Sequence, residues 1–159
     1  MRLARTLRFD ISDSQIFELP AEPDEWAVSG TFEFSNWSED DLKGKKRQAF
    51  VNGWLGLESF GRSTFVAVAE ITEQEFEAAV TVLAQHFVDD YGAPGLEAAR
   101  SVAAEELAFM QSMCADHAPN TLLVVERKLV DSGVSEAFRS IQPQEAAIDL
   151  VAIHGTLDE

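Results

Sequence analysis

Residues 73 to 117 carry a helical hydrophobic period, whereas the segments before and after them have the patterns of strands. The sequence Thr72-Glu73-Gln74-Glu75 is a capping box, which predicts that a first helix begins at residue 73. Apolar residues then recur at helical spacing, first at Phe76, Val80, Leu83 and Phe87 and, after Gly92 and Pro94, at Leu96, Ala99, Ala103, Leu107 and Met110. The short connection predicts a helical hairpin whose apolar side needs a sheet to pack on.

Three segments before the hairpin have the pattern of strands. The first alternates, with Leu3, Leu7, Phe9 and Ile11 on one face and Arg2, Thr6 and Arg8 on the other. Alternation from Trp26 to Phe34 predicts a second amphipathic strand. Ser63 to Ile71 is apolar on both faces, which predicts a central strand covered on both sides.

Three further segments follow the hairpin. Leu122 to Val130 has the pattern of a strand, and Asp131-Ser132-Gly133 supplies a tight connection. Val134 to Ile141 would return antiparallel, although its apolar residues also fit a helical face, and Ala146 to Ile153 predicts one more strand. The order of elements predicts a single α+β domain over residues 1–159, with a mostly antiparallel sheet and the hairpin packed on one face.

The charge of the chain disfavours several kinds of partner. Its 159 residues include 12 Lys and Arg against 28 Asp and Glu, a formal net charge of −16. A phosphate backbone or an anionic membrane would repel such a surface, so we expect neither nucleic acid nor membrane as a partner. An acidic surface can also serve solubility alone.

Cysteine use and hydropathy indicate the compartment. Cys114 is the single cysteine of the chain, so an internal disulfide is impossible and a reducing environment fits. No apolar run approaches the roughly 20 residues of a membrane span, and the basic N-terminus is not followed by the apolar run of a signal peptide. We therefore expect a cytoplasmic protein.

Common catalytic motifs are missing. The sequence has no Gly-x-Gly-x-x-Gly, P-loop, Gly-x-Ser-x-Gly or His-Glu-x-x-His motif. We therefore expect no cofactor and no metal, and the interpretation leans away from an enzyme. His86 with Asp89 and Asp90 has the spacing of one helical face and resembles a partial set of metal ligands, but we expect a solvated helix end instead.

A basic, glycine-rich and aromatic segment stands out in the acidic chain. Lys43, Lys45, Lys46 and Arg47 lie within five positions and are followed by aromatic and glycine residues up to Ser63. Asn52-Gly53 is a hairpin-turn signal, although Phe50, Trp54 and Leu57 also fit a helical face. A solvated loop and a folded corner would explain the segment without function.

The leading hypothesis gives residues 43–62 a binding role. It predicts a non-enzymatic accessory protein that docks a small anionic ligand or a partner protein. The residues expected to bind are Lys45, Lys46, Arg47, Trp54, Glu58, Ser59 and Arg62.

The alternative hypothesis is a small enzyme or metal-assisted hydrolase. Cys114 and His117 are three positions apart, which suits a nucleophile and its base or two metal ligands. Both residues also continue the apolar stripe of the second helix, and a buried cysteine beside a helix-end histidine is the structural interpretation.

Four stretches resemble a family of small bacterial proteins that is known only as a domain of unknown function. They are Phe50 to Phe65, Gly92-Ala93-Pro94-Gly95, Cys114 to Pro119 and Glu136-Ala137-Phe138-Arg139. The resemblance covers most of the chain and implies a bacterial, cytoplasmic origin. It implies no activity, cofactor or site residue.

The pattern also predicts self-association. Ser63 to Ile71 and Leu122 to Val125 are apolar on both sides, whereas one helical layer covers a single sheet face. The second face would then be covered by other strands or by a second copy of the chain, and we expect a homodimer.

Overall fold

The computed structural model describes residues 1–8 and 16–142. Its strands are β1 (Arg2–Leu7), β2 (Trp26–Val28), β3 (Trp54–Gly56), β4 (Arg62–Ser63), β5 (Phe65–Glu70), β6 (Leu122–Val130) and β7 (Gly133–Ile141). Its helices are α2 (Gly44–Asn52), α3 (Glu73–Tyr91) and α4 (Leu96–Cys114), with the 3₁₀ helices η1 (Thr31–Phe34) and η2 (Glu39–Asp41). Among the described residues, no helix is both long enough and apolar enough to span a membrane.

All seven strands form one sheet in the order β4-β3-β2-β1-β5-β6-β7, and every neighbouring pair is antiparallel. The longest pairing joins β6 to β7, from Leu122 opposite Ile141 to Val130 opposite Gly133. The predicted α+β fold with a mostly antiparallel sheet is confirmed. The ambiguous segment after Gly133 is a strand.

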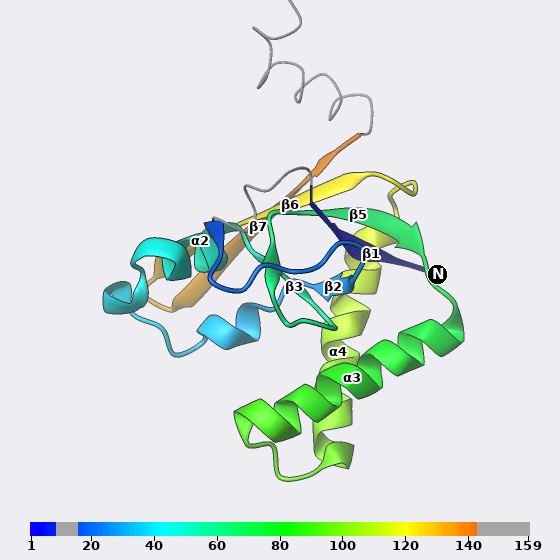
Figure 1. Ribbon diagram of the computed structural model, residues 1–159, viewed down its shortest axis with the longest axis horizontal. Coiled ribbons are helices and arrows are strands. Elements are labelled where there is room, and N and C mark those ends of the chain that lie inside the picture. Colours follow the sequence, from blue (N-terminus) through cyan, green and yellow to red (C-terminus); the bar gives the residue numbers. More distant parts are fainter. Residues whose placement is uncertain (9–15, 143–159) are drawn as a thin grey trace, which may run out of the picture.

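The helical hairpin is also confirmed and lies against one face of the sheet (Figure 1). Thr72 and Glu75 form the predicted capping box at the start of α3, and α3 ends where Gly92 adopts a φ of 69°. α4 packs on β1 and β2, whereas α3 packs mainly on α4. The core therefore lies between α4 and the inner face of the sheet, with Met110, Leu107 and Cys114 fully buried.

The opposite sheet face is less completely covered. Val66 and Val68 of β5 are buried in the main core, whereas the alternating Phe65 and Ala67 are only half-buried. The expectation that this strand is buried on both faces is therefore corrected, because only its inner face packs on the hairpin. β5 lies between β1 and β6, one place from the middle of the sheet.

The predicted strand from Trp26 to Phe34 is corrected as well. β2 ends at Val28, and Gly30, at a φ of 72°, turns the chain into η1. A Cβ at Gly30 would lie 2.6 Å from the Leu55 Cβ and 2.8 Å from Nη1 of Arg62, so the turn depends on a missing side chain. Tertiary packing thus overrides the alternation at this point.

The basic segment forms a helix. Gly44 to Asn52 is α2, and the chain passes directly from Asn52 through Gly53 into β3, so Asn52-Gly53 is not a hairpin turn. Phe50 is the fully buried residue of this helix. The strand predicted for Ala146 to Ile153, together with Phe9 and Ile11, lies outside the described residues.

Candidate functional site

Two buried arginines lie at the centre of the region between α2, η1 and the sheet. Arg62, on β4, has a side chain 5% exposed, and Arg127, on β6, has a side chain that is fully buried. Both guanidinium groups lie over the ring of Phe34, at 4.6 and 5.2 Å from its centroid. We refer to these two residues as the arginine pair.

Arg127 is held by backbone carbonyl groups from two segments and by one hydroxyl group. Its Nη1 donates to the Phe50 and Gly53 carbonyl oxygens, each at 2.9 Å, and its Nη2 donates to the Ser29 carbonyl oxygen. Nε donates to Thr31 Oγ1 at 2.8 Å. The side chain therefore satisfies carbonyl groups at the C-terminus of α2 and at the end of β2.

Arg62 shares two of these acceptors. Its Nη1 donates to the Ser29 carbonyl oxygen at 3.2 Å and to the Gly53 carbonyl oxygen at 3.1 Å. Its Nη2 donates to the Gly30 carbonyl oxygen and to Glu33 Oε1, both at 3.0 Å. Burial lowers the pKa of both arginines, and the ion pairs with Glu33 and Glu136 oppose that shift.

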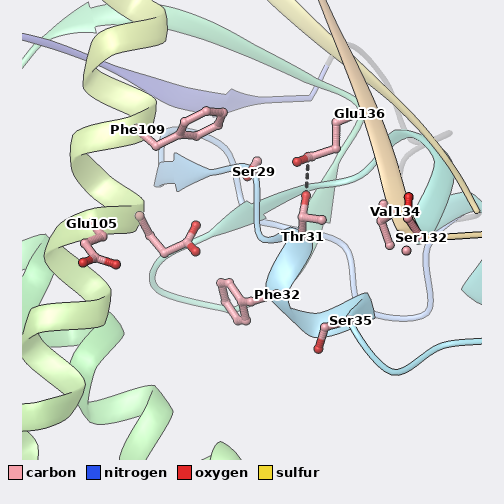
Figure 2. Close-up of a pocket in the computed structure, with 11 residues that line it drawn as sticks. Ser29, Thr31, Phe32, Ser35, Glu105, Phe109, Ser132, Val134 and Glu136 are labelled. Atoms are coloured by element: carbon pink, nitrogen blue, oxygen red, sulfur yellow. Dashed lines mark hydrogen bonds between the residues drawn. The ribbon is translucent and has the colours of Figure 1, made fainter. Parts of the chain in front are cut away.

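A pocket of about 590 Å³ opens between α4, η1 and the turn from β6 to β7 (Figure 2). We call it the carboxylate pocket. Its lining residues are Ser29, Thr31, Phe32, Ser35, Glu105, Glu106, Phe109, Ser132, Gly133, Val134 and Glu136. Figure 2 shows Glu136 and Thr31 directed toward each other, with Phe109 on the α4 side and Phe32 on the η1 side.

The three glutamates of this pocket are held differently. Glu136 accepts a hydrogen bond from Thr31 Oγ1 and pairs with Nε of Arg127 at 3.3 Å. Glu105 and Glu106 have no ion pair or side-chain hydrogen bond within the described part of the chain. Burial raises the pKa of Glu106, and the negative charges of Glu136 and Glu105 add to the shift. The pocket thus concentrates negative charge that protein cations only partly compensate.

A second pocket of about 230 Å³ lies on another side of η1. We call it the lysine pocket. Its lining residues are Phe17, Glu18, Leu19, Glu33, Trp37, Lys45, Lys46, Ala49, Phe60 and Arg62. It shares no lining residue with the carboxylate pocket.

The structure brings three of the predicted binding residues to the lysine pocket. Lys45 and Lys46 lie on α2 and are exposed, and Arg62 lies beneath them as a buried cation. Arg47 is exposed on the same helix but does not line the pocket. Trp54 is fully buried and packs near Phe138, with ring centroids 5.8 Å apart, so it is directed into the core.

Glu58 and Ser59 lie in a loop that is held by a buried carboxylate. Glu25, 1% exposed, accepts hydrogen bonds from the backbone N–H groups of Glu58 and Ser59 at 2.7 and 2.8 Å and from the Ser59 hydroxyl at 2.6 Å. Gly56 permits this approach, because a Cβ there would lie 2.5 Å from Glu25 Oε1. The Ser59 hydroxyl thus has a structural partner.

Cys114 and His117 lie three positions apart and differ in exposure, because Cys114 is buried and His117 is half-buried. The Cys114 thiol is fully buried, and burial raises its pKa to about 12. The His117 N–H donates to the Cys114 carbonyl oxygen, and its own carbonyl oxygen accepts from Nη1 of Arg2 at 2.6 Å. Burial therefore disfavours the thiolate form of Cys114, which is the form that a nucleophile or a metal ligand needs.

His86 is not the solvated residue expected from its helix position. Its side chain is 15% exposed and stacks on Phe60 with ring centroids 3.7 Å apart, while Nδ1 lies 2.9 Å from Asp90 Oδ2. Within residues 1–8 and 16–142, no three His, Cys, Asp or Glu side chains form a group that could hold a metal ion.

Sequence patterns alone did not identify the residues of the carboxylate pocket, because these residues are far apart in the sequence. They come from η1, α4 and the turn from β6 to β7, and no linear motif joins these segments. One signal was present in the strand pattern of β6. Arg127 lies two and four positions after the buried Val125 and Leu123, so its side chain is on the same, buried face of the strand. A charged residue on the apolar side of a strand indicates a buried ionic partner.

The chain belongs to a family of unknown function, DUF6505, whose model matches residues 1–159. This finding confirms the resemblance to a domain of unknown function. No curated protein and no solved structure matches the chain.

Proposed function

We propose that this member of DUF6505 is a non-enzymatic binding protein whose ligand carries a primary ammonium group on an apolar body. The carboxylate pocket receives the ligand. One observation carries the proposal: a cavity of about 590 Å³ has both apolar walls and carboxylates without an ionic partner. These carboxylates are Glu105 and Glu106, which form no ion pair in the described part of the chain.

The charge of the pocket favours a cation. Glu106 is disfavoured as an anion by burial and by two neighbouring carboxylates, which together raise its pKa. An ammonium group beside Glu106 would relieve this repulsion and favour its ionised form. The formal net charge of −16 would also raise the rate at which a cationic ligand encounters the protein.

Aromatic walls suit the apolar part of such a ligand. Phe109 is 47% exposed on α4, although it is a large apolar side chain, and it packs on Phe138 with ring centroids 5.8 Å apart. Phe32 is held on the other side by Phe87, at a centroid distance of 4.9 Å. Both rings can contact an apolar chain, and their faces attract a cation.

Glu136 would act as the fixed member of the pocket. Thr31 and Arg127 hold one of its oxygens, so its orientation is set before a ligand arrives. Glu105 and Glu106 carry no such restraint and can adjust to the ligand. The pocket therefore combines one positioned carboxylate with two adaptable ones.

Calorimetric titration with benzylamine tests the proposal. We expect benzylamine to bind, and benzyl alcohol, which has the same ring without the charge, to bind at least tenfold more weakly. Glu106→Gln should weaken benzylamine binding by roughly tenfold, which corresponds to about 1.4 kcal/mol. The same variant should not lower the stability of the free protein, because it removes repulsion between carboxylates.

Glu126→Gln is the matched control. Glu126 is exposed on β6 and does not line the pocket, so its substitution changes the net charge equally without touching the site. Equal affinities of Glu106→Gln and Glu126→Gln for benzylamine would show that net charge alone attracts the amine, and the proposal would be wrong. Absence of benzylamine binding to the wild type would overturn it as well.

A further inference from the structure

We propose that the lysine pocket is a second ligand site, which takes a small organic anion whose carboxylate or phosphate is attached to a planar ring. Its charge, its walls and its position at the beginning of α2 all favour this chemistry. The site is separate from the carboxylate pocket, with which it shares no lining residue.

The charge of this pocket is opposite to that of the molecule. Three basic side chains line it, Lys45, Lys46 and Arg62, against two carboxylates, Glu18 and Glu33. Glu33 is already engaged with Nη2 of Arg62 at 3.0 Å. The two lysines make no ion pair within the described part of the chain and are therefore available to a ligand.

The position of the lysines on α2 is unfavourable without an anion. Lys45 and Lys46 lie in the first turn of the helix, which contains no acidic residue, and Lys43 at its N-cap makes no side-chain capping hydrogen bond. Cations near a helix N-terminus are repelled by the helix dipole, and the first N–H groups lack acceptors in the helix. A bound carboxylate or phosphate beside Lys45 and Lys46 would offset this repulsion.

The walls of the pocket suit a planar ring. Trp37 packs edge-on against Phe34 at a centroid distance of 4.8 Å and is nearly parallel to Phe50 at 6.5 Å. Phe60 stacks on His86, and Phe17 is 1% exposed. These contacts hold the aromatic walls in place before a ligand arrives, so little ordering is needed on binding.

Arg62 has a different role from the lysines. Its two terminal nitrogens already donate to the carbonyl oxygens of Ser29, Gly53 and Gly30 and to Glu33. It therefore supplies a fixed positive charge beneath the pocket, and the flexible lysines contact the anion directly.

Calorimetric titrations with benzoate and phenyl phosphate, backed by amide NMR spectra, test this assignment. We expect at least one of them to bind, with shifts confined to amides of residues 44–49 and the Trp37 indole. Benzamide, which lacks the charge, and acetate, which lacks the ring, should bind at least fivefold more weakly. A preference between benzoate and phenyl phosphate distinguishes a carboxylate from a phosphate ligand.

Substitution at neighbouring positions of α2 provides a matched comparison. Lys46→Gln should weaken binding of the aromatic anion by roughly threefold, and the Lys45→Gln/Lys46→Gln pair by roughly tenfold. Arg47→Gln removes the same charge from the same helix but outside the pocket, and should leave the affinity unchanged. All three positions are exposed, so folding should be preserved and can be checked by thermal unfolding.

Two results would overturn the proposal. One is that neither benzoate nor phenyl phosphate binds the wild type at millimolar concentration. The other is that Arg47→Gln weakens binding as much as Lys46→Gln, which would reduce the effect to the general charge of α2. Neither result bears on benzylamine binding, so this site and the carboxylate pocket are tested separately.

Discussion

Arg127 connects several segments that are far apart in the sequence. Its donors reach carbonyl groups of α2 and β2, a hydroxyl of η1 and the carboxylate of Glu136. Without Arg127, the Phe50 carbonyl oxygen would lose this donor, and the Ser29 and Gly53 carbonyl oxygens would keep only Arg62. The buried polar groups around Arg127 therefore depend on this side chain for hydrogen bonds.

Replacing Arg127 by Met should therefore be strongly destabilising. We expect Arg127→Met to lower the free energy of unfolding by about 3–5 kcal/mol, because buried acceptors lose their donor and Glu136 loses its ion pair. Urea unfolding measures the change. Arg139→Met is the control, because Arg139 is exposed on β7, and its effect should stay within about 0.5 kcal/mol. Equal effects of the two variants would contradict this account.

Cys114 predicts a pH dependence of stability. Burial raises the pKa of its thiol to about 12, so above pH ~8.5 the unfolded chain loses this proton while the folded chain retains it. Stability contributed by the protonated thiol is then lost as the pH rises. Between pH 8 and pH 10 the wild type should lose about 2 kcal/mol more than Cys114→Ala.

Urea unfolding of both proteins at the two pH values measures this difference. The quantity to compare is the change in the free energy of unfolding between the two pH values. Cys114→Ala also leaves a cavity, but the cavity is present at both pH values and does not affect this change. Parallel pH profiles would show that the thiol ionises normally in the folded protein, and rapid alkylation of Cys114 under native conditions would agree with them.

The sequence predicted individual residues of the lysine pocket but none of the carboxylate pocket. Lys45, Lys46 and Arg62 were expected to lie in one binding region, and they line one pocket, because a short helix and a strand of the same segment place them. Glu106 and Glu136 could not be found, since their proximity depends on how α4 crosses the sheet. Local patterns carry no information on such long-range contacts.

Among the elements, α3 shows most directly how a local signal sets a boundary. The Thr72 hydroxyl accepts from the Glu75 N–H at 3.1 Å, and the Glu75 carboxylate accepts from the Thr72 N–H at 3.0 Å. These bonds satisfy groups that the helix itself leaves without partners. The hydrogen bond to the Thr72 N–H also lowers the pKa of Glu75.

Thr72→Ala should accordingly cost about 1 kcal/mol of stability, since it removes the acceptor for the Glu75 N–H. Thermal unfolding would show the loss. Gln74→Ala, two positions further along the same turn, serves as the comparison, because Gln74 is exposed and takes no part in the capping box. A Thr72→Ala protein as stable as Gln74→Ala would mean that the box contributes nothing.

Elements with a local signal were predicted well, and elements fixed by tertiary contacts were not. The hairpin and β6 follow from capping, periodicity and turn residues of their own segments, whereas the apolar residues of β7 also fitted a helical face. η1 departs from the pattern because Gly30 turns the chain where Leu55 and Arg62 leave no room for a side chain. α2 was ambiguous because its one buried residue, Phe50, leaves almost no hydrophobic period.

For the whole molecule, self-association stays a prediction. Phe65, Ala67 and Val124 are only half-buried on the sheet face opposite the hairpin. A second copy could cover these side chains, whereas two chains of net charge −16 repel each other at low salt. We expect light scattering to give twice the monomer mass at moderate ionic strength. A monomer mass at both low and moderate salt would exclude the dimer.

The shared acceptors of the arginine pair connect the two pockets structurally. The carbonyl oxygens of Ser29 and Gly53 each accept from both Arg62 and Arg127. A cation bound beside Glu136 would weaken the attraction between Glu136 and Arg127, and could thereby change how strongly the arginine pair holds these oxygens. Any such coupling is reciprocal, so the factor by which benzylamine changes the Kd of benzoate must equal the factor by which benzoate changes the Kd of benzylamine.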